Sequence, residues 1–289
     1  MLLNKVTDRD IPLSELRSFK NHPYKVEDNI EMDALCESIS KSGLFSPIIV
    51  RTRAGGEYEI ISGHRRYRAC QRLGYKSIPA TVFEMSDEEA IVAMVDSNLH
   101  REHILPSEKA FSYKMKLDAI KRQGERTDLT SAQLGQRLTS VEKIAAESDE
   151  SKSQVQRYIS LTRLIPELLQ MVDDGKIALT PAVELSKLHH LTQKLIYEIC
   201  YMEDLTPSYS QTVRMRKLAD EGALGEDAIR EIMSEEKANQ RERIVIYMDD
   251  IRQYYPRNIL PKDIVADIKN LLNKRRAEQL RRKENRDAR

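Results

Sequence analysis

The strand signals of this chain are concentrated before Ser86, and almost everything after that residue has the apolar spacing of helices. The segment at residues 47–63, PIIVRTRAGGEYEIISG, is typical of two strands joined by a Gly-Gly turn. Helices are expected at residues 31–42 and 65–73, and a further short strand at residues 78–84. Strands gathered at one end of a chain, followed by helices, predict an α+β fold that begins with a small mixed α/β domain.

The middle of the chain is expected to be helical. One helix is predicted at residues 86–102, where a serine cap is followed by acidic residues. The next begins at Pro106 and is expected to end at Gly124. The polar stretch at residues 124–140 is typical of a loop or linker, and helices resume from residue 141 to about residue 233.

The chain has 289 residues, which is long enough for two or three domains. A charged, apolar-poor connector at residues 234–243 indicates a boundary, followed by a predicted strand at 243–249 and a last helix from Pro261. We therefore predict domains at residues 1–105, 106–232 and 233–289. The apolar side of the last helix needs a partner, so the third domain is a candidate for dimerisation, and its final residues, 274–289, are basic.

Composition limits the class of protein. Charged residues make up 32% of the chain and aromatic residues 6%, while the formal net charge is only +1, so nucleic-acid affinity must come from local clusters. Three isolated cysteines favour neither a disulfide framework nor a zinc site. No run approaches the ~20 apolar residues needed to cross a bilayer. We expect a cytoplasmic protein.

A basic helix start follows a glycine near residue 63. Apolar strand residues 60–61 lead into Ser62 and Gly63, and a helical pattern with Arg65, Arg66 and Arg68 follows. Unpaired backbone N–H groups at a helix N-terminus bind anions, and arginines add charge-assisted bonds to phosphate oxygens. The pattern therefore predicts an anion site, with an ordinary solvated basic face as the alternative.

A second polar pair lies in the segment DSNLHREHILP. Asn98 and Arg101 are three residues apart, so on a helix both side chains can face one ligand. An amide oxygen suits magnesium, and a guanidinium suits phosphate. The chain has no G-x-x-x-x-G-K-[ST] loop, which argues against a Walker-type nucleotide site.

Residues 141–164 have the pattern of a helix-turn-helix, with the small Ala145 where the two helices pack and Asp149 at the turn in place of a glycine. Ser151 or Ser153 can cap the second helix. Glutamine and arginine can form bidentate bonds to base edges, whereas Lys152 and Arg163 suit phosphates. A structural helix pair is the alternative. The predicted DNA-binding residues are Ser151, Lys152, Ser153, Gln154, Gln156, Arg157 and Arg163.

The segments GLFSPIIVR, GHRRYRA and SNLHREHILP, in that order, resemble the N-terminal domain of ParB-type chromosome and plasmid partition proteins, and the similarity extends over roughly residues 8–190. The resemblance implies a sulfiredoxin-like domain that binds CTP with Mg²⁺. The nucleotide-binding residues that it implies are Gly63, His64, Arg65, Arg66, Arg68, Asn98 and Arg101, with Asn98 also near the metal.

Two positions depart from the family. His64 replaces the glutamate of its first box, and Ser97 replaces the glutamate of its second box, so the resemblance implies CTP binding with at most weak hydrolysis. The family implies a nucleoid-associated homodimer that binds a palindromic DNA site as a CTP-responsive clamp, with a ParA-type ATPase as partner. The alternative is a transcriptional regulator of a plasmid or mobile element that binds DNA without nucleotide.

Overall fold

The computed structural model describes residues 4–53, 55–99, 101, 104–127, 139–235, 251, 254–256 and 259–287. The chain divides into two compact units, Met1–Glu235 and Glu236–Arg289. Most of the predicted linker at residues 124–140 and the whole predicted strand at residues 243–249 lie outside the described residues.

The first unit begins with a five-stranded mixed sheet in the order β1-β5-β3-β4-β2. Its strands are β1 (Asn4–Pro12), β2 (Leu16–Arg17), β3 (Ile48–Thr52), β4 (Tyr58–Ser62) and β5 (Ser77–Glu84). β1 pairs antiparallel with β5 and β3 with β4, whereas β5 and β2 run parallel to β3 and β4 respectively. β3 and β4 are buried along most of their length, because they lie inside the sheet.

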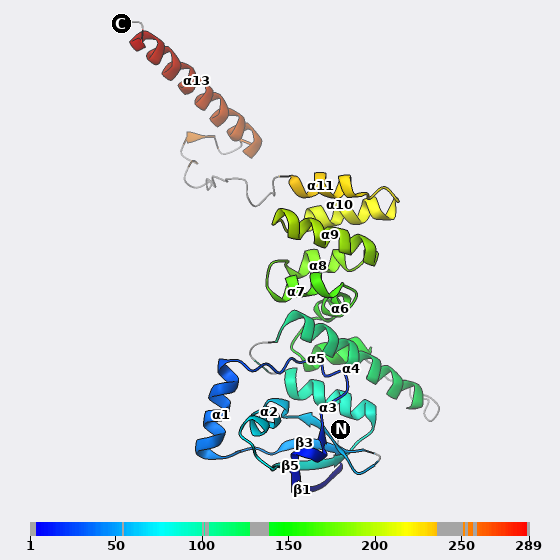
Figure 1. The fold of residues 1–289 in the computed structure, drawn as a ribbon. Coiled ribbons are helices and arrows are strands. Elements are labelled where there is room, and N and C mark those ends of the chain that lie inside the picture. The colour runs from blue at the N-terminus through cyan, green and yellow to red at the C-terminus, as the bar shows by residue number, and fades with distance from the viewer. Residues whose placement is uncertain are drawn as a thin grey trace. The chain divides into compact units, whose positions relative to one another are not determined.

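Three helices cover the sheet (Figure 1): α1 (Ile30–Ser42), α2 (His64–Arg72) and α3 (Asp87–Leu99). The side chain of Asn29 caps the start of α1, and Gly43, with a φ of 73°, ends it, which agrees with the helix predicted at residues 31–42. α1 packs against α2, which contacts β3, and α3 packs against β4. The junction between β4 and α2 therefore lies at Gly63, next to the N-terminal end of the basic helix.

Helices make up the rest of the first unit, from green to yellow in Figure 1. They are α4 (Pro106–Thr127), α5 (Ser140–Glu147), α6 (Lys152–Leu161), α7 (Pro166–Asp173), α8 (Leu179–Leu185), α9 (His190–Glu203), α10 (Tyr209–Asp220) and α11 (Glu226–Ser234). Leu161, Leu168, Leu185, Ile196 and Ile229 are buried in one shared core. The α+β class is confirmed, and no helix among the described residues is long and apolar enough to cross a membrane.

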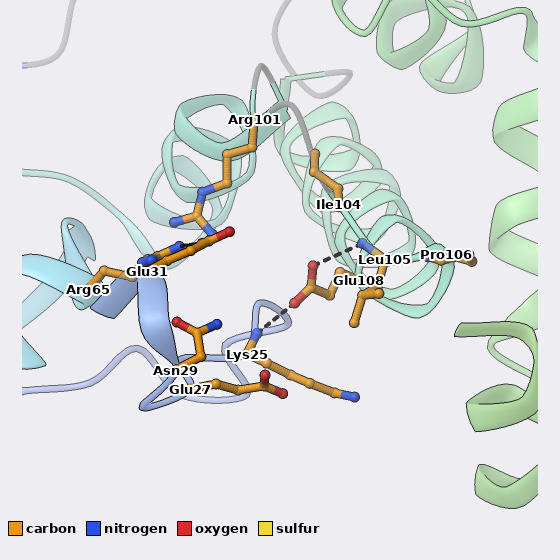
Figure 2. A pocket seen from close by; sticks show the side chains of 10 residues that line it. All are labelled: Lys25, Glu27, Asn29, Glu31, Arg65, Arg101, Ile104, Leu105, Pro106 and Glu108. Carbon is orange, nitrogen blue, oxygen red and sulfur yellow. Dashed lines mark hydrogen bonds and ion pairs between the residues drawn. The ribbon is translucent and has the colours of Figure 1, made fainter. Parts of the chain in front are cut away.

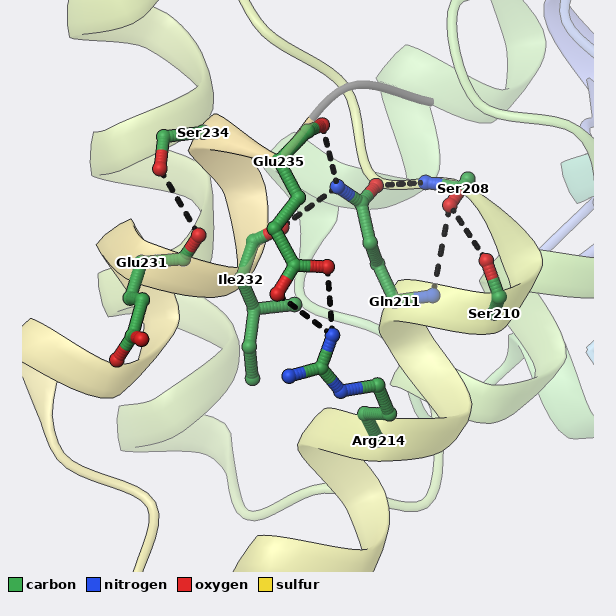
Figure 3. Close-up of polar contacts among 8 residues, drawn as sticks. All are labelled: Ser208, Ser210, Gln211, Arg214, Glu231, Ile232, Ser234 and Glu235. Carbon is green, nitrogen blue, oxygen red and sulfur yellow. Dashed lines mark hydrogen bonds and ion pairs between the residues drawn. The ribbon is translucent and has the colours of Figure 1, made fainter. Parts of the chain in front are cut away.

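A polar contact fixes the last helix of this unit (Figure 3). The buried Gln211 side chain donates from Nε2 to the carbonyl oxygen of Ile232 at 2.6 Å and accepts at Oε1 from the Ser208 N–H at 2.8 Å. Arg214 holds both carboxylate oxygens of Glu235, at 2.7 and 2.6 Å. The C-terminal end of α11 is thus anchored to α10 at the boundary of the unit.

Three local predictions were wrong. α4 does not end at Gly124 but continues to Thr127, because one glycine costs a helix only about 1 kcal/mol. A break in the helical region was also expected at Pro181, but this residue lies in the first turn of α8, where its missing N–H has no helical partner to lose. The nine-residue strand β1 was not predicted.

The second unit contains α13 (Pro261–Asp287), which agrees with the last predicted helix. Ile264 is buried, whereas Val265, Leu271 and Leu272 are more than half exposed. The apolar side chains on this helix are thus largely uncovered in the described part of the single chain.

Candidate functional site

A cleft of about 700 Å³ lies where the residues before α1, the start of α2 and the segment leading into α4 come together (Figure 2). It is lined by Lys25, Glu27, Asn29, Glu31, Arg65, Arg101, Ile104, Leu105, Pro106 and Glu108. Three basic and three acidic side chains face it. Of the residues predicted to bind nucleotide, Arg65 and Arg101 line this cleft.

The two arginines reach the cleft from different elements. Arg65 lies in the first turn of α2, and its Nη1 is 3.0 Å from a carboxylate oxygen of Glu31. Arg101 follows α3, and its guanidinium lies over the Tyr24 ring, 5.4 Å from the centroid. Burial lowers the pKa of Arg101. Figure 2 shows its guanidinium pointing toward the ion pair of Arg65 and Glu31, so two cationic groups converge at one end of the cleft.

Gly63 is required at the start of α2 because of its backbone conformation and its close contact with β3. Its φ is 101°, in the left-handed region. A Cβ at this position would lie 2.6 Å from Cγ2 of Ile48 and 3.1 Å from the Arg66 guanidinium. Gly63 therefore lets α2 approach β3, which is a packing requirement inside the protein rather than an approach to ligand.

His64 is buried behind the cleft and does not line it. Its ring lies 3.8 Å from the ring of His22, and its Nε2 accepts from the Phe19 N–H at 3.4 Å. Burial, together with the charges of His22 and Arg101, lowers the pKa of His64 to about 3. This imidazole is therefore neutral at ordinary pH, and it supports the segment that carries Tyr24.

Arg66 and Arg68 are engaged in holding the scaffold. Arg66 donates to the carbonyl oxygens of Ser46 and Pro47, at 2.6 and 2.8 Å, and so fixes the loop before β3. Arg68 makes two bonds to the Asp28 carboxylate, at 3.2 and 2.5 Å. Neither side chain lines the cleft.

Asn98 is 3% exposed and also lies outside the cleft lining. Its amide nitrogen donates to the Met94 carbonyl at 2.7 Å and to Ser97 Oγ at 3.2 Å. The predicted convergence of Asn98 and Arg101 on one ligand is therefore absent from this arrangement. Across the described ranges, no three histidine, cysteine or carboxylate side chains are grouped as a metal site.

The predicted helix pair is formed by α5 and α6. Thr139 and Glu142 make a reciprocal capping box at the start of α5. The Thr139 N–H and Lys152 hold the pKa of Glu142 down to about 2. Asp149 takes the left-handed conformation predicted for the turn, with a φ of 53°. Ser151, rather than Ser153, caps α6 by accepting from the Gln154 N–H at 3.1 Å.

The two faces of α6 differ. Val155 is fully buried and, with Ile144 and Ala145 of α5, packs against Tyr113 and Leu117 of α4. The predicted DNA-binding side chains lie on the other face: Ser151, Lys152, Ser153, Gln156, Arg157 and Arg163 are exposed and Gln154 is half-buried. Lys152 forms an ion pair with Glu142 at 3.0 Å. The exposed face thus carries basic and amide groups that protein contacts do not cover.

Comparison with known proteins identifies the first part of the chain. Residues 3–99 match the model of the ParB N-terminal domain family. These residues form a ParB N-terminal domain. The resemblance found in the three sequence motifs is therefore confirmed for the segment that contains the sheet, α1, α2 and α3.

The chain is also similar to curated proteins whose alignments extend beyond residue 99. A nucleoid occlusion protein of Geobacillus sp. (strain WCH70) is 35% identical over 130 residues, which are 45% of this chain and 44% of the relative. The stage 0 sporulation protein J of Bacillus subtilis is 29% identical over 220 residues, 73% of this chain and 72% of the relative. The chain spans less than half the length of the nucleoid occlusion proteins it matches.

Among solved structures, C-terminally truncated ParB from Caulobacter crescentus is similar in two complexes. The complex with the centromeric parS site matches 78% of this chain and 98% of that chain, at 22% identity and a TM-score of 0.43. The complex with CTP-gamma-S matches 63% and 93%, at 26% identity and a TM-score of 0.32.

Sequence reasoning missed the acidic part of the cleft, which is lined both by the ParB N-terminal domain and by the residues that follow it. Glu108 is buried, and its carboxylate accepts from the Lys25 N–H at 2.7 Å and the Leu105 N–H at 3.1 Å. A glutamate in the first turn after Pro106 is a helix-start signal that could have indicated this residue. Glu31 carries a similar helix-start signal in the first turn of α1, but its pairing with Arg65 could not be predicted because the two residues are distant in the sequence.

Proposed function

We propose that this chain is a site-specific DNA-binding protein of chromosome partition whose ParB N-terminal domain binds CTP with Mg²⁺. The observation that carries the proposal is the convergence of Arg65 and Arg101 on a cleft that leads directly into α4. The relatives' names point in the same direction: one similar protein is a chromosome-partitioning protein of Thermus thermophilus, 31% identical over 167 residues.

The cleft suits a nucleotide in size and charge. Its volume of about 700 Å³ falls within the range of roughly 300–1,000 Å³ typical of small-molecule sites. Guanidinium groups bind phosphate oxygens in a bidentate manner, and Lys25 adds a third cationic side chain at the cleft. The choice of cytidine rests on the resemblance of GHRRYRA and SNLHREHILP to the family boxes.

Binding is favoured over hydrolysis. Ser97, at the position of the family glutamate, donates its hydroxyl to the Met94 carbonyl at 2.9 Å and carries no carboxylate. The neighbouring Asp96 is paired with Lys116. Magnesium would enter with the triphosphate, and Asn98 would reach it only after turning its amide away from Met94.

The helix pair is proposed to act as a helix-turn-helix, with α6 in the major groove. Gln156 and Arg157 are exposed on α6 and suit base edges, whereas Arg163 suits a phosphate. A homodimer would present two such helices to a palindromic site. The family resemblance also implies a ParA-type ATPase as a protein partner.

Nucleotide could influence DNA binding through α4. The Glu108 carboxylate joins the start of this helix to the backbone of Lys25, at the edge of the cleft. The same helix packs against α5 and α6. A nucleotide that contacts Arg65 and Arg101 can change the DNA-binding state only if it binds one conformation of this region more tightly than another.

The test of nucleotide binding is thermal unfolding of the full chain with CTP and Mg²⁺. A ligand at about 100 times its Kd stabilises the folded state by about 2.7 kcal/mol. Arg65→Ala should abolish the protection. Arg72→Ala is the matched control, because Arg72 lies on the same helix, pairs with Asp33 and does not line the cleft. Protection that survives Arg65→Ala would place the nucleotide elsewhere.

The test of DNA reading compares two variants on genomic DNA of the source. Gln156→Ala should relax base preference by about 1–3 kcal/mol at one position. Arg163→Ala should weaken binding to all sequences alike and flatten the salt dependence. Arg163 is a cleaner phosphate probe than Lys152, which is paired with Glu142. Equal losses on specific and random DNA for both variants would refute the assignment of α6.

One observation favours a second function, the nucleotide-free regulator of a plasmid or mobile element. The arginines of α2 already have protein partners: Arg65 pairs with Glu31, Arg68 with Asp28, and Arg72 with Asp33. A regulator would use these ion pairs only to hold α1 against α2. Sequence-specific footprints that are unchanged by CTP, together with no thermal protection, would establish this alternative.

A further inference from the structure

The Glu31 carboxylate already pairs with one of the cations that line the cleft. It lies in the first turn of α1 and approaches Nη1 of Arg65 at 3.0 Å, while the Arg101 guanidinium points toward the same ion pair (Figure 2). A carboxylate presents two acceptor oxygens to such cations, as a phosphate does.

This ion pair is not needed to hold α1 in place. The start of α1 is capped by Asn29, whose side chain accepts from the Met32 N–H at 3.0 Å. The same end is held to α2 by Arg68 with Asp28 and by Arg72 with Asp33. The Glu31 side chain is 69% exposed, and exposed ion pairs are weak because water solvates both partners. Glu31 can therefore leave Arg65 without unfolding the helix.

We propose that Glu31 is a built-in competitor that an anionic ligand must displace from Arg65. A ligand with a single weak charge gains little from this exchange. A triphosphate chain carries several negative charges and can pair with more than one of the cations that line the cleft, Lys25, Arg65 and Arg101. Glu31 thus sets a threshold that favours polyanions over monoanions. The inference rests on the proposed binding of a polyanion in this cleft, but not on the identity of its base.

Removal of the Glu31 carboxylate should change the anion affinity in one direction if Glu31 competes with the ligand, and in the opposite direction if Glu31 helps to bind it. If the carboxylate competes, its removal strengthens binding of the anion and leaves two uncompensated guanidinium groups. If it holds a metal with the ligand, or orders the cleft, its removal weakens binding. Glu31→Gln keeps the size of the side chain and removes only the charge, so it separates the two cases.

The experiment measures binding of tripolyphosphate without metal, and of CTP with Mg²⁺, to the full chain by calorimetry. Glu31→Gln should bind tripolyphosphate about 2- to 5-fold more tightly than the unmodified chain, the range expected for loss of an exposed ion pair. Asp28→Asn is the matched control: it removes the same charge from the same segment, but its partners Arg68 and Arg72 do not line the cleft. Its affinity should stay close to that of the unmodified chain.

A double-mutant cycle adds the decisive comparison. In an Arg65→Ala background, Glu31→Gln should no longer increase affinity, because the competed cation is gone. Equal or weaker tripolyphosphate binding by Glu31→Gln, an equal gain in Asp28→Asn, or no anion binding by any variant would each overturn the inference. If tripolyphosphate binds more tightly to Glu31→Gln while CTP binds to neither protein, the competitor role stands and the proposed CTP site fails.

Discussion

The burial of His64 predicts a specific loss of stability in mild acid. His64 has its pKa lowered from 6.5 to about 3 in the folded chain. As the pH falls below 6.5, the unfolded chain takes up a proton at this residue and the folded chain does not. The unfolded state is therefore favoured by about 1.4 kcal/mol for each pH unit, which amounts to about 2 kcal/mol between pH 6.5 and pH 5.

The assay is urea unfolding of the full chain at several pH values in this interval. The unmodified chain should lose about 2 kcal/mol more than His64→Gln, whose side chain can still accept from the Phe19 N–H but does not titrate. Parallel stability curves for the unmodified chain and His64→Gln would refute a neutral, buried His64.

Three further substitutions test other contacts by the same unfolding assay. Gly63→Ala should lower the free energy of unfolding by about 2–4 kcal/mol, because the new methyl group clashes with β3 in addition to the left-handed backbone strain. Gly74→Ala has the same strain but meets open space, so it should cost about 1 kcal/mol. Equal losses would contradict the close contact between Gly63 and β3. Lys116→Met should lower the free energy of unfolding by about 1–2 kcal/mol, because the two carboxylates that pair with the fully buried ammonium are half exposed and water can solvate them once it is gone. A loss above about 4 kcal/mol would show that water does not reach these carboxylates in the variant. Gln211→Ala should cost about 1–3 kcal/mol by stranding the Ile232 carbonyl, and an unchanged midpoint would show that this bond does not anchor α11.

Local signals in the sequence predicted most elements around the cleft. The Gly-Gly turn, the cap of α6 and the left-handed Asp149 depend on a few neighbouring residues, so a single sequence contains the necessary information. β1 carries no such signal, because it is an edge strand whose residues are mostly charged and exposed before Ile11. Its pairing with β5 is a long-range contact that apolar periodicity cannot reveal.

The cleft was predicted only in part for a related reason. The basic motif correctly indicated Arg65, but the acidic partners of α2 lie far away in the sequence, in the segment before and at the start of α1. Which arginine faces the cleft depends on how α1 docks on α2. The type of residue and its spacing could not separate a ligand-facing arginine from one engaged in holding the scaffold.

The arginines of α2 have different contacts, so substitutions at each of them must be interpreted differently. Arg66 fixes the loop before β3 through two backbone carbonyls, so its removal should lower stability and distort the cleft together. Arg68 and Arg72 make largely exposed ion pairs at the start of α1, so loss of either side chain should change stability and the cleft only slightly. Arg65 has only an exposed pair with Glu31 to lose, so its removal should weaken anion binding with little change in unfolding. Loss of binding in an Arg66 variant is therefore not evidence of ligand contact, whereas loss of binding at unchanged stability in an Arg65 variant is.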